Sequence, residues 1–335
     1  MDTLRLGILG CADIVRRAVF QPLPQLSGIQ AAGIANRTRS RAERLAAEFG
    51  IEQVFEGLEE LLDSPDLDAV YIALSNELHA EWAIRAIQAG KHVLVEKPLA
   101  LHAAQAKQIA EAAHSSGLHV WEALMVRHHP WQAELRRLLE TGRYGQALRL
   151  HTELNIPAKA DSFNNYRSFP DKGGGVFYDL GCYWLQFIQA MFGLEDARVA
   201  DWGGRSDFAG PRGCDWSFVS FIRFTDGPFA AFSGSFEKPY RARHVVETEG
   251  AVLTINDFFR ANVGRYKITI KVENRSGQLL DMIEFEPQHY YENQLGHFRD
   301  AVLYGHPPDK SLYEALERVR WMELIRQSAV LQHKS

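Results

Sequence analysis

The chain has 335 residues, of which 46% are hydrophobic, and this is enough for two domains with sizeable cores. The formal net charge is -5, so the chain lacks the excess of basic residues typical of a nucleic-acid-binding protein. The 13 histidines are scattered along the sequence and do not indicate a metal site. Because there is no membrane-length apolar run, no secretory leader and no metal-ligand spacing among the three cysteines, we expect a cytoplasmic protein with free thiols.

The first predicted strand, residues 4–9, leads into a candidate phosphate-binding turn. The turn consists of Gly10, Cys11, Ala12, Asp13 and Ile14. It stands where the G-x-G-x-x-G loop of dinucleotide-binding domains brings backbone N–H groups to a pyrophosphate. Only Gly10 of the three glycines is present, because Ala12 and Val15 occupy the other two positions. On its own the motif is weak, and a plain strand-turn-helix is a comparable interpretation.

Strands and helices then alternate as far as residue 123. The predicted strands cover 30–35, 69–74, 92–98 and 118–123, and the predicted helices cover 40–50, 77–89 and 102–116. Ser40 and Glu43 have the spacing of a capping box at the start of a helix. Such alternation predicts an α/β fold with a doubly wound parallel sheet, and therefore a Rossmann domain over residues 1–123.

The residues after the second strand bear on the choice of cofactor. A domain that binds NAD places an acidic residue here for the ribose 2′-hydroxyl, whereas a domain that binds NADP needs a cation. The chain has Asn36, Arg37 and Thr38 and no acid. Because the Arg37 guanidinium can grip a phosphate in a fork, we expect NADP, with NAD still possible. The alternative is that Arg37 only solvates a loop.

A buried strand delivers charge to its carboxyl end at residues 92–98. The apolar run Val93–Val95 stops at Glu96, Lys97 and Pro98. Open α/β sheets bind their ligands at the carboxyl ends of the strands, so Lys97 is a candidate catalytic residue. The alternative is a surface lysine that forms an ion pair with Glu96.

The pattern changes after residue 123. A helix predicted at 131–140 is followed by strands predicted at 147–156, 216–224, 229–236, 244–249, 251–255, 266–272 and 279–285, and then by a helix at 312–327. Closely spaced strands with turn signals between them indicate an antiparallel sheet. Residues 124–335 are therefore predicted to form an α+β domain with a large, mostly antiparallel sheet that binds substrate and mediates oligomerisation.

Three consecutive glycines, residues 173–175, precede a second group of chemically capable residues. The glycines allow the backbone to pass close to another group. In the helical pattern that follows, Asp179 and Tyr183 lie four residues apart on one face. The alternative is a buried tyrosine that bonds to an aspartate for structural reasons, and Tyr178 lies on the next face.

Taken together, these motifs resemble the glucose-fructose oxidoreductase/inositol dehydrogenase (Gfo/Idh/MocA) family over essentially the whole chain. The resemblance rests on Glu96-Lys97-Pro98, on the stretch 71–79 and on the Asp-x-Gly-x-Tyr segment that ends at Tyr183. The turn at 10–14 and the stretch 122–130 point to the branch with dihydrodiol dehydrogenase, D-xylose dehydrogenase and deoxysugar ketoreductases.

The resemblance implies roles for particular residues. Lys97 would be the active-site lysine, Tyr183 the proton donor and Asp179 their neighbour. Further residues expected to border the cofactor are Ser75, Asn76, His79, Glu96 and Lys97. Residues expected near the substrate are Trp121, Arg127, Asn165, Tyr166, Arg167 and Tyr183. For His79 a purely structural hydrogen-bonding role is the favoured alternative.

The implied activity is NADP(H)-dependent hydride transfer between nicotinamide and the carbonyl or hydroxyl carbon of a sugar, sugar derivative or cyclic polyol. Hydride addition builds negative charge on the carbonyl oxygen, which Lys97 would stabilise and Tyr183 would protonate. Alternatives are a non-catalytic NADP-binding sensor and a reductase of a non-sugar carbonyl or imine. The presence of both Lys97 and Tyr183 favours an enzyme. An exposed face of the antiparallel sheet would suit a homodimer or larger homo-oligomer.

Overall fold

The computed structural model describes residues 3–159, 163–305 and 311–334. They form two compact units. The first unit comprises Met1–Met125 and Tyr291–Val319, and the second comprises Val126–Tyr290 and Arg320–Ser335. The sequence analysis assigned everything after residue 123 to the second domain. Tyr291–Val319 groups with the first unit instead, since Ala315 and Val319 are buried in its hydrophobic core.

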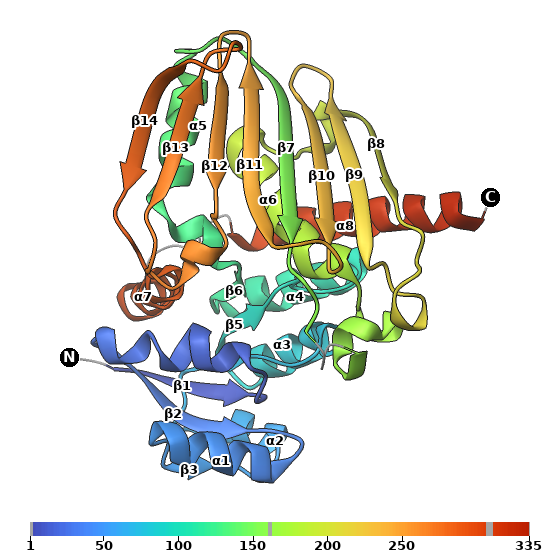
Figure 1. Cartoon of the computed structure of the whole chain (residues 1–335). Helices are drawn as coiled ribbons and strands as arrows, with labels where there is room; N and C mark the ends of the chain where they lie inside the picture. The colour runs from blue at the N-terminus through green and yellow to red at the C-terminus, as the bar shows by residue number, and fades with distance from the viewer. Residues whose placement is uncertain (1–2, 160–162, 306–310, 335) are drawn as a thin grey trace. The chain divides into compact units, whose positions relative to one another are not determined.

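The first unit contains the predicted doubly wound parallel sheet (Figure 1). Its strands are β1 (Leu4–Leu9), β2 (Ile29–Ala35), β3 (Gln53–Val54), β4 (Ala69–Ile72), β5 (His92–Glu96) and β6 (Val120–Ala123). They lie in the order β3-β2-β1-β4-β5-β6, and every pair is parallel. The Rossmann prediction is confirmed. Strand β3 was not predicted, because two residues are too few to show a periodic pattern.

The helices of the first unit include the predicted ones over 40–50, 77–89 and 102–116 and the start of the one over 312–327, whereas the helices over 58–63 and 290–304 were not predicted. They are α1 (Arg39–Phe49), α2 (Leu58–Asp63), α3 (His79–Gln88), α4 (Ala103–Ser116) and α7 (Tyr290–Tyr304), with the start of α8 (Ser311–Lys334). The capping box at Ser40 is wrong. Helix α1 begins one residue earlier, after the extended residue Thr38, so Ser40 lies inside its first turn and Glu43 accepts a hydrogen bond from Arg39.

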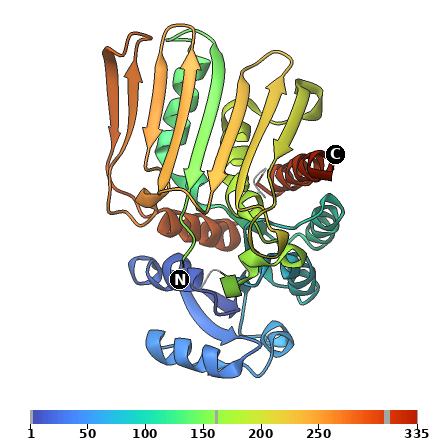
Figure 2. The same ribbon diagram turned by 45° about the vertical axis from the view of Figure 1, so that its right-hand side comes forward.

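The second unit is built on a mostly antiparallel sheet of eight strands, as predicted. The strands are β7 (Ala147–Asn155), β8 (Val199–Arg205), β9 (Ser217–Phe224), β10 (Phe229–Ser235), β11 (Arg241–Thr248), β12 (Val252–Asn256), β13 (Ile268–Glu273) and β14 (Leu279–Phe285). Strands β7 and β10 run parallel, and the other neighbours run antiparallel. Helices α5 (Pro130–Glu140) and α6 (Cys182–Phe192) lie behind one face of this sheet (Figures 1 and 2).

Three elements late in the chain differ from the sequence analysis. Helix α7 was not predicted, and α8 is longer than the predicted helix over 312–327. Strand β8 was also missed, because Asp201, Gly203 and Gly204 weaken its strand pattern. Within the ranges that the structure covers, none of the helices has both the length and the apolar character that crossing a bilayer requires.

Candidate functional site

The first unit gathers the residues expected near the cofactor at one edge of its sheet. Gly10 follows β1, Asn36 follows β2, Ser75 lies beyond β4, and Lys97 directly follows β5. Because these strands are parallel, their carboxyl ends meet at the same edge. This is the edge where open α/β sheets bind ligands.

The turn after β1 needs a glycine for a reason internal to the fold. Gly10 has φ +98°, and a Cβ there would lie 2.4 Å from the carbonyl oxygen of Ala73 beyond β4. Ala12, at the second glycine position, is half-buried, and Val15, at the third, is fully buried in the helical turn that follows. The strand-turn-helix is thus tightly packed at Gly10 and Val15.

Arginines without acidic partners surround the turn after β2. The exposed guanidinium of Arg37 has no carboxylate partner among the residues that the structure describes, and neither have Arg41 and Arg44 of α1. Arg39, in contrast, pairs with Glu43 at 2.8 Å and with Glu56. The first three cations are therefore available to an anionic ligand. The sequence analysis named Arg37 and missed Arg41 and Arg44, which a three-residue helical spacing places on one face.

The same cations act on the thiol in the neighbouring turn. Burial raises the pKa of Cys11 to about 11, while the charges of Arg41, Arg16 and Arg44 oppose this shift. Arg41 and Arg44 therefore lie close enough to the Gly10–Ile14 turn to add positive potential there. A phosphate-bearing cofactor is the kind of ligand that this part of the first unit can hold.

Glu96, next to Lys97, is part of a buried network that the sequence did not predict. Its carboxylate accepts a hydrogen bond from the hydroxyl of Tyr71 on β4. Burial raises the pKa of Glu96, and the Tyr71 hydrogen bond and the charges of Lys97 and Arg17 oppose this. Burial also raises the pKa of Tyr291, which lies near Arg17 and Glu96, to about 12. Glu96 is therefore shared between Tyr71 and the cations, and Lys97 is half-buried beside it.

His79 makes the kind of backbone hydrogen bonds expected of a structural histidine. Its side chain is fully buried, with Nδ1 2.8 Å from the carbonyl oxygen of Pro98 and Nε2 3.2 Å from that of Leu74. Burial lowers the pKa of His79, although both hydrogen bonds oppose the shift. The ring thus connects the turns that follow β4 and β5. Asn76, three residues before His79, is also buried. The hydroxyl of Ser75 donates a hydrogen bond to the carboxylate of Glu77.

The second unit brings Asp179, Tyr183 and Arg167 together. Arg167 donates two hydrogen bonds to Asp179, from Nε at 2.8 Å and from Nη2 at 3.2 Å. Burial is the largest single effect and disfavours the Arg167 cation, but the charge of Asp179, its hydrogen bonding and the charges of Tyr166 and Tyr183 together outweigh burial and raise the pKa of Arg167. The buried phenol of Tyr183 therefore lies within electrostatic range of the guanidinium.

The Asp179 segment has a local geometry that the sequence did not reveal. Residues Phe177–Gly181 form a π-helical turn that continues into α6. Such turns widen a helix and recur at functional sites. Tyr183 packs edge-to-face against Phe259, whereas Tyr178 lies under the guanidinium of Arg326. The two tyrosines thus face different surroundings, as the helical spacing predicted.

The glycines before this turn make room for the protein itself. Gly175 has φ +107°, and a Cβ there would lie 2.1 Å from Oδ1 of Asp215. Oδ2 of Asp215 accepts a hydrogen bond of 2.7 Å from the N–H of Phe177. A Cβ on Gly174 would collide with the carbonyl oxygens of residues 166, 167 and 169. The sequence analysis missed Asp215, because no local pattern links it to a turn 40 residues earlier.

The remaining candidate substrate residues fall in both units. In the second unit, Asn165 accepts a hydrogen bond of 3.0 Å from the N–H of Arg167, whose guanidinium stacks over the ring of Tyr166. Arg127 is half-buried in the same unit. Trp121 belongs to the first unit, where it packs edge-to-face against Phe298.

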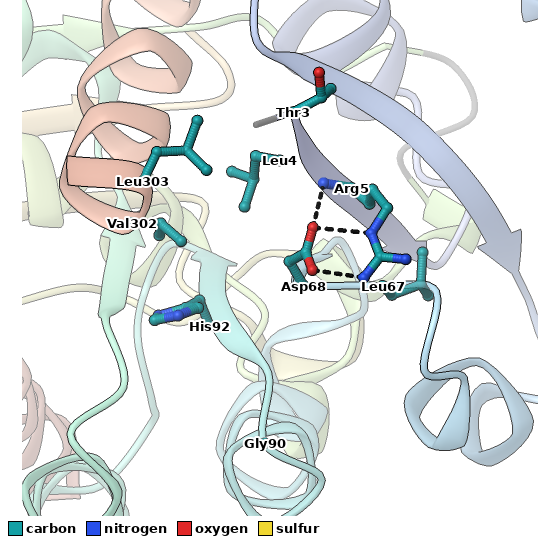
Figure 3. A pocket seen from close by; sticks show the side chains of 9 residues that line it. All are labelled: Thr3, Leu4, Arg5, Leu67, Asp68, Gly90, His92, Val302 and Leu303. Atoms are coloured by element: carbon teal, nitrogen blue, oxygen red, sulfur yellow. Dashed lines mark hydrogen bonds and ion pairs between the residues drawn. The ribbon is translucent and has the colours of Figure 1, made fainter. Parts of the chain in front are cut away.

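A pocket of about 460 Å³ in the first unit lies at the other edge of the sheet (Figure 3). Its lining includes the amino-terminal residues of β1 and β5, together with Val302 and Leu303 of α7. At its polar side Arg5 is neutralised by two side-chain hydrogen bonds to Asp68. Since it contains none of the candidate residues and no free charge, we do not assign the activity to this pocket.

Comparisons with known proteins agree with this geometry. Residues 4–124 match the model of the oxidoreductase family with an NAD-binding Rossmann fold, and residues 132–254 match the GFO/IDH/MocA C-terminal domain. A dTDP-3,4-didehydro-2,6-dideoxy-alpha-D-glucose 3-reductase from Actinomadura kijaniata is 39% identical, over 98% of this chain and 96% of that protein. D-xylose 1-dehydrogenase (NADP(+)) 2 from Haloferax volcanii is 29% identical, over 97% of each chain.

A solved structure shows the same fold over nearly the whole length. The 3-ketoreductase KijD10 from Actinomadura kijaniata, in complex with NADP and TDP-benzene, has a TM-score of 0.88 and 26% sequence identity. The alignment covers 98% of each chain. The two-unit architecture is therefore shared from end to end.

Proposed function

Because this chain belongs to the Gfo/Idh/MocA family of NAD(P)-dependent oxidoreductases, we propose that it transfers hydride between NADP(H) and a sugar-type carbonyl or hydroxyl carbon. The observation that carries the proposal is Lys97 at the carboxyl end of β5, beside the buried carboxylate of Glu96. A non-catalytic sensor has no need of a lysine at this place.

The arginines beside β2 support NADP as the cofactor. The 2′-phosphate is a dianion on one side of the nucleotide, and Arg37, Arg41 and Arg44 are cations without carboxylate partners in the described chain. The turn at Gly10 follows β1, where dinucleotide-binding domains bring backbone N–H groups to a pyrophosphate. The D-xylose dehydrogenase relative is named for NADP(+), and KijD10 was solved with NADP. The bound nicotinamide supplies or accepts the hydride.

In the proposed mechanism, Lys97 and Tyr183 divide the work on the substrate oxygen. Lys97 stabilises the negative charge that develops on the oxygen during reduction, and Tyr183 delivers the proton. The nearby Arg167 cation favours the phenolate that remains after proton transfer. Asp179 holds Arg167 in place with two hydrogen bonds. In the oxidising direction the same phenolate accepts the proton.

The substrate class is a sugar, a sugar derivative or a cyclic polyol. Asn165, Tyr166 and Arg167 offer amide, hydroxyl and guanidinium groups suited to hydroxylated substrates. The named relatives act on a deoxysugar nucleotide and on xylose. These names support a carbohydrate-like substrate.

The test is a screen of aldoses, ketoses, sugar nucleotides and vicinal diols by the change in NADPH absorbance, with wild type and Lys97→Met. Lys97→Met nearly keeps the side-chain volume but removes the charge that acts in the transition state, so turnover should be lost while cofactor binding persists. A variant that keeps most of its kcat would leave Lys97 as a structural ion-pair partner. Cofactor binding without turnover of any compound by the wild type would favour the sensor.

We also propose that the chain forms a homo-oligomer through the face of the eight-stranded sheet opposite α5 and α6. Val219 and Met282, on β9 and β14, are 51% and 46% exposed. Phe221 and Phe229 stack on this sheet and are half-buried. Light scattering should give the mass of a dimer or a larger oligomer, and Val219→Glu should shift it toward the monomer.

A further inference from the structure

Lys97 lies in a turn just beyond the last backbone pairing of β5. Side chains, rather than a neighbouring strand, hydrogen-bond to the backbone of this turn. The last paired residues of β5 and β6 are Glu96 and Ala123. Beyond them, the peptide unit between Pro98 and Leu99 is bonded from both sides. Its carbonyl oxygen lies 2.8 Å from Nδ1 of His79, and its N–H donates to Oε1 of Glu122 at 2.9 Å.

Glu122 is in turn held by an arginine far away in the sequence. Arg318, in the part of α8 that groups with the first unit, donates to Oε2 of Glu122 from Nη2 at 2.6 Å and from Nε at 3.2 Å. The two carboxylate oxygens thus have separate partners, since Oε1 is left for Leu99. The side chains of Arg318 and Glu122 are 1% and 3% exposed.

A buried ion pair contributes little net stability compared with well-packed apolar residues, so its presence calls for another explanation. Here the carboxylate of the pair also accepts a hydrogen bond from the N–H of Leu99, two residues after Lys97. We propose that Glu122 and Arg318 are positioning residues, which fix the Pro98–Leu99 peptide and thereby the place from which the Lys97 side chain extends. This inference rests on the proposed catalytic role of Lys97.

Two double variants separate this role from a contribution to folding. Glu122→Gln/Arg318→Met removes both charges but keeps an amide oxygen that can accept from Leu99. Glu122→Met/Arg318→Met has nearly the same shape and offers no acceptor there. Neither leaves an unpaired buried charge, so both should fold, and a thermal melt checks this.

The expected result is a difference in turnover between the two. The Glu122→Gln/Arg318→Met protein (Gln/Met) should keep kcat within a few-fold of wild type. The Glu122→Met/Arg318→Met protein (Met/Met) should lose about ten- to a hundredfold in kcat, with a smaller change in KM. The reason is that a small displacement of the Lys97 side chain from its reactive position lowers the rate strongly. Its Leu99 amide should also exchange hydrogen faster. If Met/Met fails to fold, Glu122→Leu/Arg318→Met takes its place.

Two controls complete the experiment. Arg5→Met/Asp68→Leu removes an ion pair at the amino ends of β1 and β4 and should leave kcat unchanged (Figure 3). In a Lys97→Met background, the Gln/Met and Met/Met substitutions should give equal residual rates, because the lysine through which they act is gone.

The outcomes separate the two proposals. Equal kcat for Gln/Met and Met/Met in the wild-type background, or equal losses in the Arg5/Asp68 control, would overturn the positioning role. If Lys97→Met alone keeps its turnover, the proposed function fails. In that case Leu99 exchange still reports whether Glu122 holds the turn.

Discussion

Arg167 and Asp179 are joined by two hydrogen bonds, and the pair is asymmetric in its exposure. The Asp179 side chain is 8% exposed and that of Arg167 is 34% exposed. The carboxylate is thus buried under a guanidinium that reaches solvent. The sequence analysis assigned Arg167 to the substrate, and the structure adds a second role for it, as the partner of Asp179.

Replacing Arg167 should therefore cost stability. Arg167→Met removes both charge-assisted hydrogen bonds to a buried carboxylate, and we expect the free energy of unfolding to fall by about 1.5–3 kcal/mol. Arg167→Lys should recover only part of this, because an ammonium cannot form the same fork. Urea denaturation measures the change. Arg136→Ala, at an exposed pair with Glu140 on α5, is the control and should cost about 0.5 kcal/mol or less.

Arg37→Ala should weaken NADP(H) binding more than NAD(H) binding. Losing a forked contact to a phosphate costs about 1.5–3 kcal/mol, which is roughly ten- to a hundredfold in affinity. Arg39→Ala is a matched control, because Glu43 and Glu56 already engage its guanidinium. Fluorescence titration with both cofactors gives the dissociation constants. Tighter binding of NAD than of NADP by the wild type would contradict the NADP proposal.

Tyr183→Phe should lower kcat by about 10²–10⁴ with a smaller change in KM, since the ring is kept and the proton is lost. Tyr178→Phe should do little, because that ring packs under Arg326 rather than against Phe259. In wild type, reduction should decline at high pH, where the phenol ionises, and oxidation should rise. Equal damage from both substitutions would show that another group supplies the proton.

Asp215 should make stability depend on pH. Burial raises the pKa of Asp215 from 3.8 to about 6. The folded state therefore binds this proton more tightly than the unfolded chain does. The resulting stability is fully present below about pH 4 and is lost as the pH rises through 6.

Asp215→Asn removes this titration while it keeps an oxygen that can accept from the Phe177 N–H. Between pH 4 and pH 7 the stability of the variant relative to wild type should rise by about 2–3 kcal/mol. Denaturation of both proteins across this range measures the difference. A constant difference would show that Asp215 does not titrate in the folded protein.

Local pattern was enough to predict much of the molecule. The alternation of apolar runs with helical segments predicted the parallel sheet, because a strand or helix shows its period within a few residues. The same logic placed Lys97 at the end of β5. Elements without such periods, such as the two-residue strand β3, were missed.

Only the tertiary structure decided which residues complete each site. A buried charge such as Glu122 must have a partner, and this need can be inferred from an acid at the end of an apolar strand. Its partner, Arg318, comes from 196 residues further along the chain. Likewise Asp215 fills the space beside Gly175, and Tyr71 holds Glu96. Sequence periodicity describes neighbours along the chain, whereas burial pairs charges and hydrogen bonds across any separation, so the partners emerge only when the chain is folded.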